Sequence, residues 1–253
     1  MNSKNDIKIL AIETASEACS AALLIVGEDN NQRTFEQIEL KPRQHAKLIL
    51  SLLDTVLEEG NTSLKDVDVI AFGQGPGAFT GLRIAAGVAQ GISLSVDKRV
   101  VPVSTLAALA LQTVKELEKQ EIKYENEIIA TALDARMGEV YWGLFILNGS
   151  KIEALGEEQV SKPEIMLESL LKTVADMKSC HILAVGEGWG AYQEEIFHDN
   201  NIENITHLKM LSPTASSIAT LALPLYRDNK TVAPEDAQPV YIRNDVAKKS
   251  QKK

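Results

Sequence analysis

The order in which the hydrophobic pattern changes along the chain restricts its fold more than any single motif does. Short apolar or alternating stretches, typical of β-strands, give way to stretches in which apolar residues recur at helical spacing. The first part of the chain predicts, in order, strands at 7–12, 20–26 and 35–40, a helix at 44–58, a strand at 67–72, a helix at 79–94, a strand at 100–103 and a helix at 105–119.

The second part repeats this order after a polar stretch at 120–127. It predicts strands at 128–133, 139–147 and 151–160, a helix after Pro163, a strand at 182–185, a short helix at 192–197 and a final helix at 214–226. Two successive units with the same order indicate two α/β lobes, each a mixed sheet flanked by helices, that face each other across a cleft. By analogy of fold, this is the two-lobed actin-like arrangement (ASKHA) of sugar kinases and Hsp70-like ATPases, and such analogy does not by itself give a function.

We place the boundary between the lobes at Ser104, which is also the expected N-cap of the helix that follows. The N-terminal lobe then comprises residues 1–104 and the C-terminal lobe residues 105–253. The final helix, at 214–227, is expected to pack back on the N-terminal lobe.

Composition limits the compartment and the partners. A net charge of -9 repels phosphate backbones, so direct and unaided nucleic-acid binding is disfavoured. The four lysines Lys248, Lys249, Lys252 and Lys253 gather at the tail, where such a run is typical of a solvated chain end. Two cysteines without disulfide or metal spacing indicate a reduced, cytoplasmic compartment, and we expect no segment long enough to cross a membrane.

The segment Gly73-Gln74-Gly75-Pro76-Gly77 joins a buried strand to a helix. Its glycines let the backbone turn tightly and approach a neighbouring segment, and the N-terminus of the next helix offers free N–H groups to an anion. The spacing of the glycines is that of neither a P-loop nor a dinucleotide-binding fingerprint. From the residues alone, a plain strand-to-helix turn is the favoured interpretation.

Extended to residues 73–93, this segment reads GQGPGAFTGLRIAAGVAQGIS and resembles the GPGSFTGLRIG signature of the TsaB (YeaZ) family. Three further segments fit the same family, at residues 9–15, 44–50 and 132–141. These segments occur in order within about the first 145 residues, and the remainder agrees with the family in length and element order.

The resemblance implies a non-catalytic, activating subunit with an actin-like fold. Members of this family pair with the larger paralogue TsaD, which carries the catalytic site, and the ATPase TsaE joins the assembly. The complex transfers a threonylcarbamoyl group from threonylcarbamoyl-adenylate to N6 of adenosine 37 in tRNAs that read ANN codons. The resemblance therefore implies contact with tRNA through the complex, and a homodimer when the chain is alone.

The histidines argue against a catalytic metal. The catalytic paralogue carries HxxxH on a helix, whereas this chain has His45 followed four residues later by Ile49, which cannot bind a metal. The other three, His181, His198 and His207, show no such pairing. We therefore predict no metal and no catalytic residue, and a metalloprotease function is disfavoured.

A nucleotide site is weakly indicated. Glu13-Thr14-Ala15-Ser16 offers an acid and hydroxyls, but it lacks the glycine that would let the backbone approach a phosphate. In the second lobe, Gly186 and Gly188 could cradle an adenosine, although Glu187 adds negative charge between them. ATP or ADP would thus bind only weakly at these positions, with no other cofactor. The alternative function is an ATP-dependent small-molecule kinase of the same superfamily.

The predicted partner surface lies on the two helices of the first lobe. It comprises His45, Leu48, Ile49, Leu52, Leu53, Val56, Phe79, Gly81, Leu82, Ala85 and Ala89. Small residues at four-residue spacing let helix backbones approach, so this pair could dock on an equivalent pair as a four-helix bundle. The competing interpretation is that both helices pack on their own sheet. We expect Leu52→Glu or Ala85→Arg to break partner binding while leaving the isolated fold intact.

Overall fold

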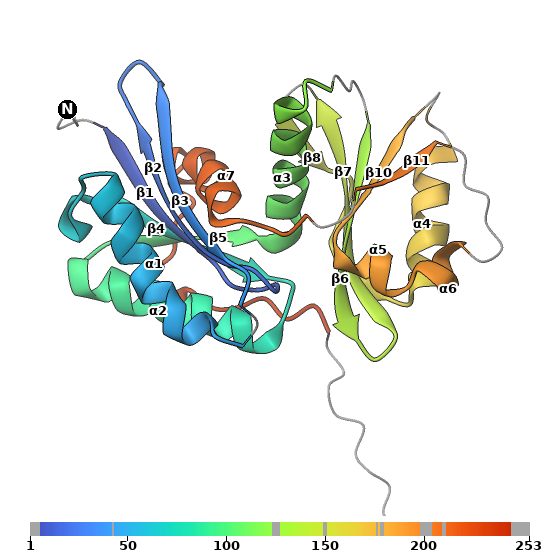
Figure 1. Ribbon diagram of the computed structural model, residues 1–253, viewed down its shortest axis with the longest axis horizontal. Helices are drawn as coiled ribbons and strands as arrows, with labels where there is room; N and C mark the ends of the chain where they lie inside the picture. The colour runs from blue at the N-terminus through green and yellow to red at the C-terminus, as the bar shows by residue number, and fades with distance from the viewer. Residues whose placement is uncertain are drawn as a thin grey trace, which may run out of the picture.

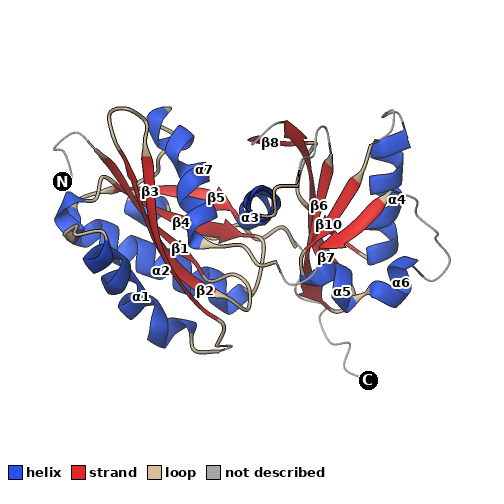
Figure 2. Cartoon of the chain, turned by 45° about the horizontal axis from the view of Figure 1, so that its top comes forward, coloured by secondary structure: helices blue, strands red, loops and turns tan. Residues whose placement is uncertain are grey.

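The structure of the chain, a computed structural model, consists of two lobes, each with one β-sheet covered by helices on both faces (Figures 1 and 2). It describes residues 6–41, 43–122, 127–148, 151–175, 177, 180–197, 204–208 and 211–243.

The first lobe is built on a five-stranded sheet of order β3-β2-β1-β4-β5. Its strands are β1 (Ile7–Glu13), β2 (Cys19–Val26), β3 (Gln32–Glu39), β4 (Val69–Gly75) and β5 (Arg99–Ser104). β1 pairs antiparallel with β2 and parallel with β4. The central strands are almost wholly apolar because both of their faces are buried.

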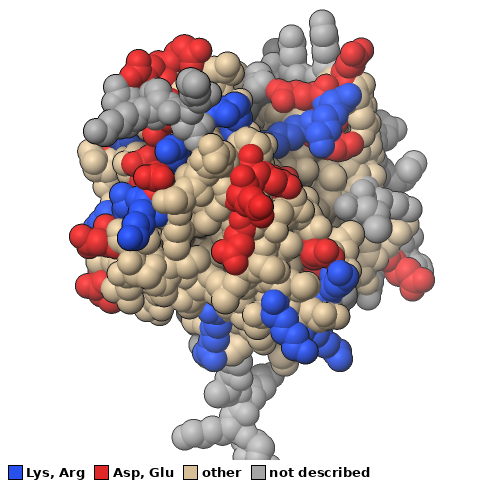
Figure 3. Space-filling view, turned by 60° about the vertical axis from the view of Figure 1, so that its left-hand side comes forward, with Lys and Arg blue, Asp and Glu red and all other residues tan. Residues whose placement is uncertain are grey.

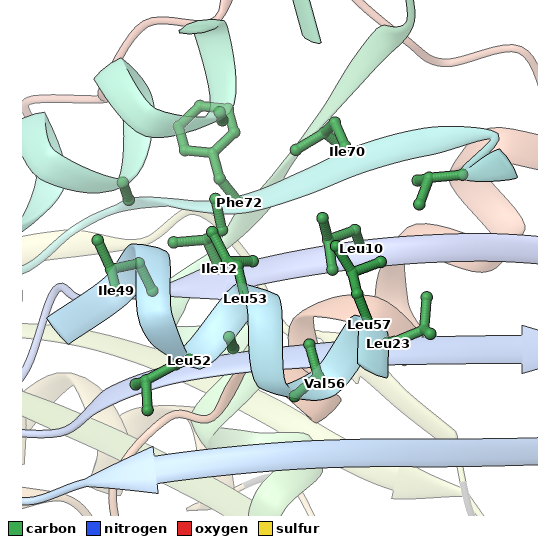
Figure 4. Packing of buried hydrophobic residues seen from close by; sticks show 14 of the residues in the cluster. Leu10, Ile12, Leu23, Ile49, Leu52, Leu53, Val56, Leu57, Ile70 and Phe72 are labelled. Carbon is green, nitrogen blue, oxygen red and sulfur yellow. The ribbon is translucent and has the colours of Figure 1, made fainter. Parts of the chain in front are cut away.

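Three helices cover this sheet. Helices α1 (His45–Glu59) and α2 (Phe79–Val96) lie on one face, and α7 (Ala215–Arg227), close to the end of the chain, lies on the other. The short 3-10 segments η1 (Leu64–Asp66) and η2 (Pro234–Asp236) flank this lobe. In Figure 4 the apolar side of α1 faces side chains of β1, β2 and β4.

The second sheet has the order β11-β10-β6-β7-β8, with β9 paired to β7. Its strands are β6 (Ile128–Arg136), β7 (Glu139–Asn148), β8 (Lys151–Ala154), β9 (Gln159–Ser161), β10 (Ile182–Val185) and β11 (Ile205–Leu208). Helix α3 (Thr105–Lys119) covers one face. The other face is covered by α4 (Pro163–Ala175), α5 (Glu187–Ala191) and α6 (Gln193–Phe197).

Both lobes therefore start with antiparallel strands and continue with parallel strands joined through helices. This confirms the two-lobed actin-like fold predicted from the sequence. β5 ends at Ser104 and α3 begins at the next residue. The hydroxyl of Ser104 accepts a hydrogen bond from the N–H of Ala107 at 3.0 Å, so the expected N-cap is confirmed.

The structure differs from the sequence-based expectations in three respects. The strand expected at 151–160 is divided into β8 and β9, because Gly156 adopts a φ of 122° that is incompatible with an extended strand. β11 and α5 were not predicted, since each is short. Among the described helices, α2 is long and apolar enough by length and composition to cross a membrane, contrary to expectation. Its buried side chains cover the first sheet.

Candidate functional site

Most of the residues predicted to bind a partner are buried inside the first lobe. The buried ones are His45, Ile49, Leu52, Leu53, Val56, Gly81, Leu82, Ala85 and Ala89, whereas Leu48 is half-buried and Phe79 is exposed. The physical reason is that the sheet face beneath them is itself apolar, so α1 and α2 use their strongest apolar stripes to cover it (Figure 4). These buried side chains pack within the chain and are not available to a partner.

Two of the buried residues show why the expected variants fail. Ala85 is fully buried and Leu52 is 9% exposed, and both belong to the core cluster between the helices and the sheet. Leu52→Glu and Ala85→Arg would each place a charge in that core, so they would damage the isolated lobe itself.

His45 has a structural role at the start of α1. Its Nε2 lies 3.1 Å from the carbonyl oxygen of Ser16, in the turn between β1 and β2. Across the described residues, no group of three or more histidine, cysteine, aspartate or glutamate side chains could hold a metal ion. His181 is hydrogen-bonded to Thr206, at 2.9 Å from its hydroxyl, and His198 lies outside the described residues.

The surface left open on α2 is a different stripe of the helix. It comprises the exposed residues Gly87, Gly91 and Leu94, bordered by Ile84 and Val88, which are half-buried against the core cluster; together we call them the outer face of α2. A β-carbon on either glycine would have no heavy atom within 4 Å, and Leu94 is 66% exposed. On a helix, positions 84, 87, 88, 91 and 94 follow one another along one side, so this face is a continuous stripe of small and apolar residues.

The sequence carried a signal for this face that the prediction missed. Glycine inside a helix costs about 0.5–1 kcal/mol relative to alanine, so two glycines four residues apart require a reason. The buried stripe is instead formed by Gly81, Ala85 and Ala89. Both stripes have small residues at four-residue spacing, and only the position of the sheet distinguishes them.

The turn after β1, where a nucleotide site was weakly indicated, is closed by its own chain. The carboxylate of Glu13 is fully buried and accepts hydrogen bonds from the N–H of Ala15 at 2.5 Å and from the hydroxyl of Thr105 at 3.3 Å. Burial raises the pKa of Glu13 to about 7, although these hydrogen bonds act in the opposite direction. The hydroxyl of Thr14 donates to the carbonyl oxygen of Gly81 at 2.8 Å.

The glycine-rich segment packs against this same turn. A β-carbon at residue 77 would lie 2.6 Å from the carbonyl oxygen of Ala15, and one at residue 81 would lie 1.9 Å from that of Thr14. The N–H of Ala78, just before α2, donates to the carbonyl oxygen of Ala15 at 2.8 Å. The glycines thus allow a close approach between two segments of the chain, which is sufficient to explain them without a phosphate.

Gly186 and Gly188 also have a packing explanation. A β-carbon at residue 186 would lie 2.3 Å from the carbonyl oxygen of Ala132, and one at residue 188 would lie 2.9 Å from its carbonyl carbon. Because both residues are glycines, α5 can lie directly on β6. Beside them, burial raises the pKa of Glu187, and the negative charges of Glu17 and Asp134 raise it further. These carboxylates would repel the phosphates of a nucleotide.

The two lobes are joined by hydroxyl groups at consecutive residues. Thr105 donates to Glu13 of the first lobe, and Ser104 donates to Glu158 of the second. Burial raises the pKa of Glu158, while the hydrogen bond from Ser104 lowers it. The start of α3 is therefore held by a carboxyl group from each lobe.

Comparison with known proteins decides the family. The Escherichia coli protein named tRNA threonylcarbamoyladenosine biosynthesis protein TsaB is 36% identical over 247 residues, which is 95% of this chain and 96% of that one. The chain belongs to the TsaB family. The Haemophilus influenzae TsaB protein is 34% identical and covers 95% of each chain. Membership places the chain among proteins named for the biosynthesis of threonylcarbamoyladenosine in tRNA.

The TsaB-family chain is also related to TsaD. The family model described as "TsaD: tRNA N6-adenosine threonylcarbamoyltransferase" matches residues 32–251, so the chain falls within the wider family that this model describes. An individual transferase, from Chlorobium phaeobacteroides, is 32% identical over only 40% of this chain. The structure called YeaZ from Pseudomonas aeruginosa is 35% identical, with a TM-score of 0.75, and covers 93% of this chain and 99% of its own.

Proposed function

We propose that this chain is a non-catalytic subunit of the complex that transfers a threonylcarbamoyl group to N6 of adenosine 37 in tRNAs that read ANN codons. It binds the catalytic paralogue TsaD and stabilises its active form, and the ATPase TsaE joins the same assembly. The observation that carries this proposal is the full-length similarity to TsaB proteins. The chain needs no cofactor for this role, and any ATP or ADP would bind weakly.

The outer face of α2 is the proposed docking surface. Gly87 and Gly91 have open space around them, so a partner helix could approach the backbone of α2 closely, with Leu94 filling its groove. The match to the TsaD family model suggests that TsaD has an equivalent pair of helices. The two pairs would then form a four-helix bundle. Alone, the same face would pair with a second copy as a symmetric homodimer.

Three features of the first lobe support a non-catalytic role. Ile49 stands where a second histidine of a metal pair would be needed. The carboxylate of Glu13 is enclosed, and its oxygens are used by Ala15 and Thr105. The glycine-rich segment is packed against the turn at Thr14 and Ala15. The chain therefore uses for its own packing the groups that a kinase of this fold would turn toward a nucleotide.

Size-exclusion chromatography with light scattering tests this proposal, using the chain alone and mixed with TsaD from the same organism. We expect a stable mixed complex, which Gly87→Arg or Gly91→Arg abolishes, since the new side chain projects from the docking surface at positions where a β-carbon has no heavy atom within 4 Å. Glu168→Arg, on the exposed side of α4 in the other lobe, is the matched control.

Two results would contradict the proposal. One is a complex that forms equally well with Gly91→Arg and with the unaltered chain, which would remove α2 from the interface. The other is no complex at all, even with tRNA, TsaE and ATP present. In that case, saturable ATP hydrolysis with a small-molecule substrate would favour the kinase function.

A further inference from the structure

An exposed cluster of aromatic and arginine side chains lies where α2 begins. The guanidinium carbon of Arg83 lies 3.8 Å from the centre of the Phe79 ring, and its Nε donates to the hydroxyl of Tyr241 at 3.2 Å. The rings of Phe79 and Tyr241 have centroids 5.4 Å apart. Phe79 is 55% exposed and Tyr241 is 45% exposed. In the described part of the chain no carboxylate pairs with Arg83.

The same surface continues onto the second lobe. Tyr241 is held in place because the N–H of Val240 donates to the carbonyl oxygen of Gln74 at 2.8 Å. Arg243 follows Tyr241 by two residues, so their α-carbons are at most about 7 Å apart. Arg243 pairs with Glu139 and donates to the carbonyl oxygen of Arg136. The side chain of Arg136 is 85% exposed while it pairs with Asp134 at 2.8 Å.

The arginines of this surface differ in how they are paired. Arg136 and Arg243 are paired with Asp134 and Glu139, and the carboxyl groups of Glu17 and Glu187 also lie near Asp134, whereas Arg83 pairs with no carboxylate in the described part of the chain. Figure 3 shows Lys and Arg side chains along the lower edge of the molecule, next to the point where the described chain ends. The ten residues beyond Arg243 contain four lysines and one aspartate.

We propose that this aromatic–arginine surface, made by Phe79, Arg83, Arg136, Tyr241 and Arg243, contacts the tRNA in the assembled complex. The inference rests on the proposed function. Aromatic rings and a stacked guanidinium offer flat faces on which an unpaired base can stack, and unpaired bases are what proteins recognise in single-stranded RNA loops. Arg83, which pairs with no carboxylate in the described part of the chain, can neutralise a phosphate.

RNA fits this surface better than a protein partner does. The outer face of α2, with its open glycines, is shaped for a helix, whereas the surface at Arg83 and Tyr241 is aromatic and cationic. The overall charge of -9 also explains why one such patch would contribute within the complex and bind tRNA poorly alone. Arg83 lies one turn before Gly87 on α2, so the two surfaces adjoin, and the test below separates contact with RNA from contact with protein.

The test measures tRNA affinity on complexes whose assembly has first been checked by light scattering. The complex of this chain with TsaD is titrated into a fluorescently labelled tRNA that reads an ANN codon, at several salt concentrations. We expect Arg83→Glu to raise the Kd about tenfold and to reduce the dependence of log Kd on log salt by about one. Tyr241→Ala should weaken binding more than Tyr241→Phe, which keeps the ring.

Lys65→Glu is the matched control, with the same change of charge on η1, at the opposite end of β4 from Phe79. We expect it to leave the Kd unchanged. An unchanged Kd for Arg83→Glu in an intact complex would overturn the tRNA surface and leave the proposed function standing. If Arg83→Glu prevents assembly, the surface contacts protein and the RNA inference is wrong. Failure of the unaltered chain to assemble would overturn both.

Discussion

A β-carbon on residue 73 would stand 1.9 Å from Oε2 of Glu13. The carboxylate cannot move aside, because it is fully buried and its two oxygens accept hydrogen bonds from Ala15 and Thr105. Glu13 and Gly73 are therefore packed directly against each other. As long as Glu13 keeps this position, residue 73 must be glycine.

Gly73→Ala should lower the free energy of unfolding by about 1–3 kcal/mol, since the added methyl group overpacks a rigid site. Gly87→Ala, on the outer face of α2, should raise it by about 0.5–1 kcal/mol, because alanine is the better helix former and meets nothing there. Urea unfolding followed by circular dichroism measures both variants. Similar destabilisation of the two would show that the contact with Glu13 has no special role.

The raised pKa of Glu13 predicts a loss of stability as the pH rises. Protonated Glu13 is favoured in the folded state, so its contribution is complete below its ordinary pKa of 4.5 and is lost as the pH rises through about 7. Glu13→Gln, which stays neutral, should match the unaltered chain near pH 4.5 and exceed it above pH 7, by on the order of 3 kcal/mol. Thermal melts across this range provide the measurement, and parallel curves would rule out a buried, titrating Glu13.

Periodicity predicted where the helices of the first lobe lie, but it could not predict which side of each meets the sheet. Helix α2 carries Ala85 and Ala89 on one side and Gly87 and Gly91 on another, and both rows have the spacing of a close helix contact. The choice between them depends on the position of β4, which is a tertiary property. Similarly, the four residues of β11 show no strong pattern, and pairing with the edge of β10 makes them a strand.

The two sides of α1 should respond differently to the same substitution. The side chain of Leu52 is only 9% exposed. Leu52→Glu therefore places a carboxylate in the core and should lower the free energy of unfolding by several kcal/mol. Leu50 is on the same helix and is 56% exposed. Leu50→Glu should therefore change the free energy of unfolding by less than about 0.5 kcal/mol. Differential scanning calorimetry compares them. Equal melting temperatures would mean that Leu52 faces outward, as the sequence had suggested.

Ser104 offers a way to separate helix capping from contact between the lobes. Its hydroxyl accepts from the N–H of Ala107 and donates to the carboxyl group of Glu158. Ser104→Ala removes both interactions and should cost about 1–2 kcal/mol. Aspartate is as good an N-cap as serine, so Ser104→Asp would restore stability if capping alone mattered.

We expect Ser104→Asp to remain less stable than the unaltered chain at pH 7, because two carboxylates would then meet in a partly buried site. Burial already raises the pKa of Glu158, so lowering the pH should protonate it and let it donate a hydrogen bond to the new carboxylate. The stability of Ser104→Asp relative to Ser104→Ala should therefore rise as the pH falls. Urea unfolding at several pH values measures this difference. If the difference stays constant with pH, Ser104 acts as a helix cap and Glu158 has no part in holding the lobes together.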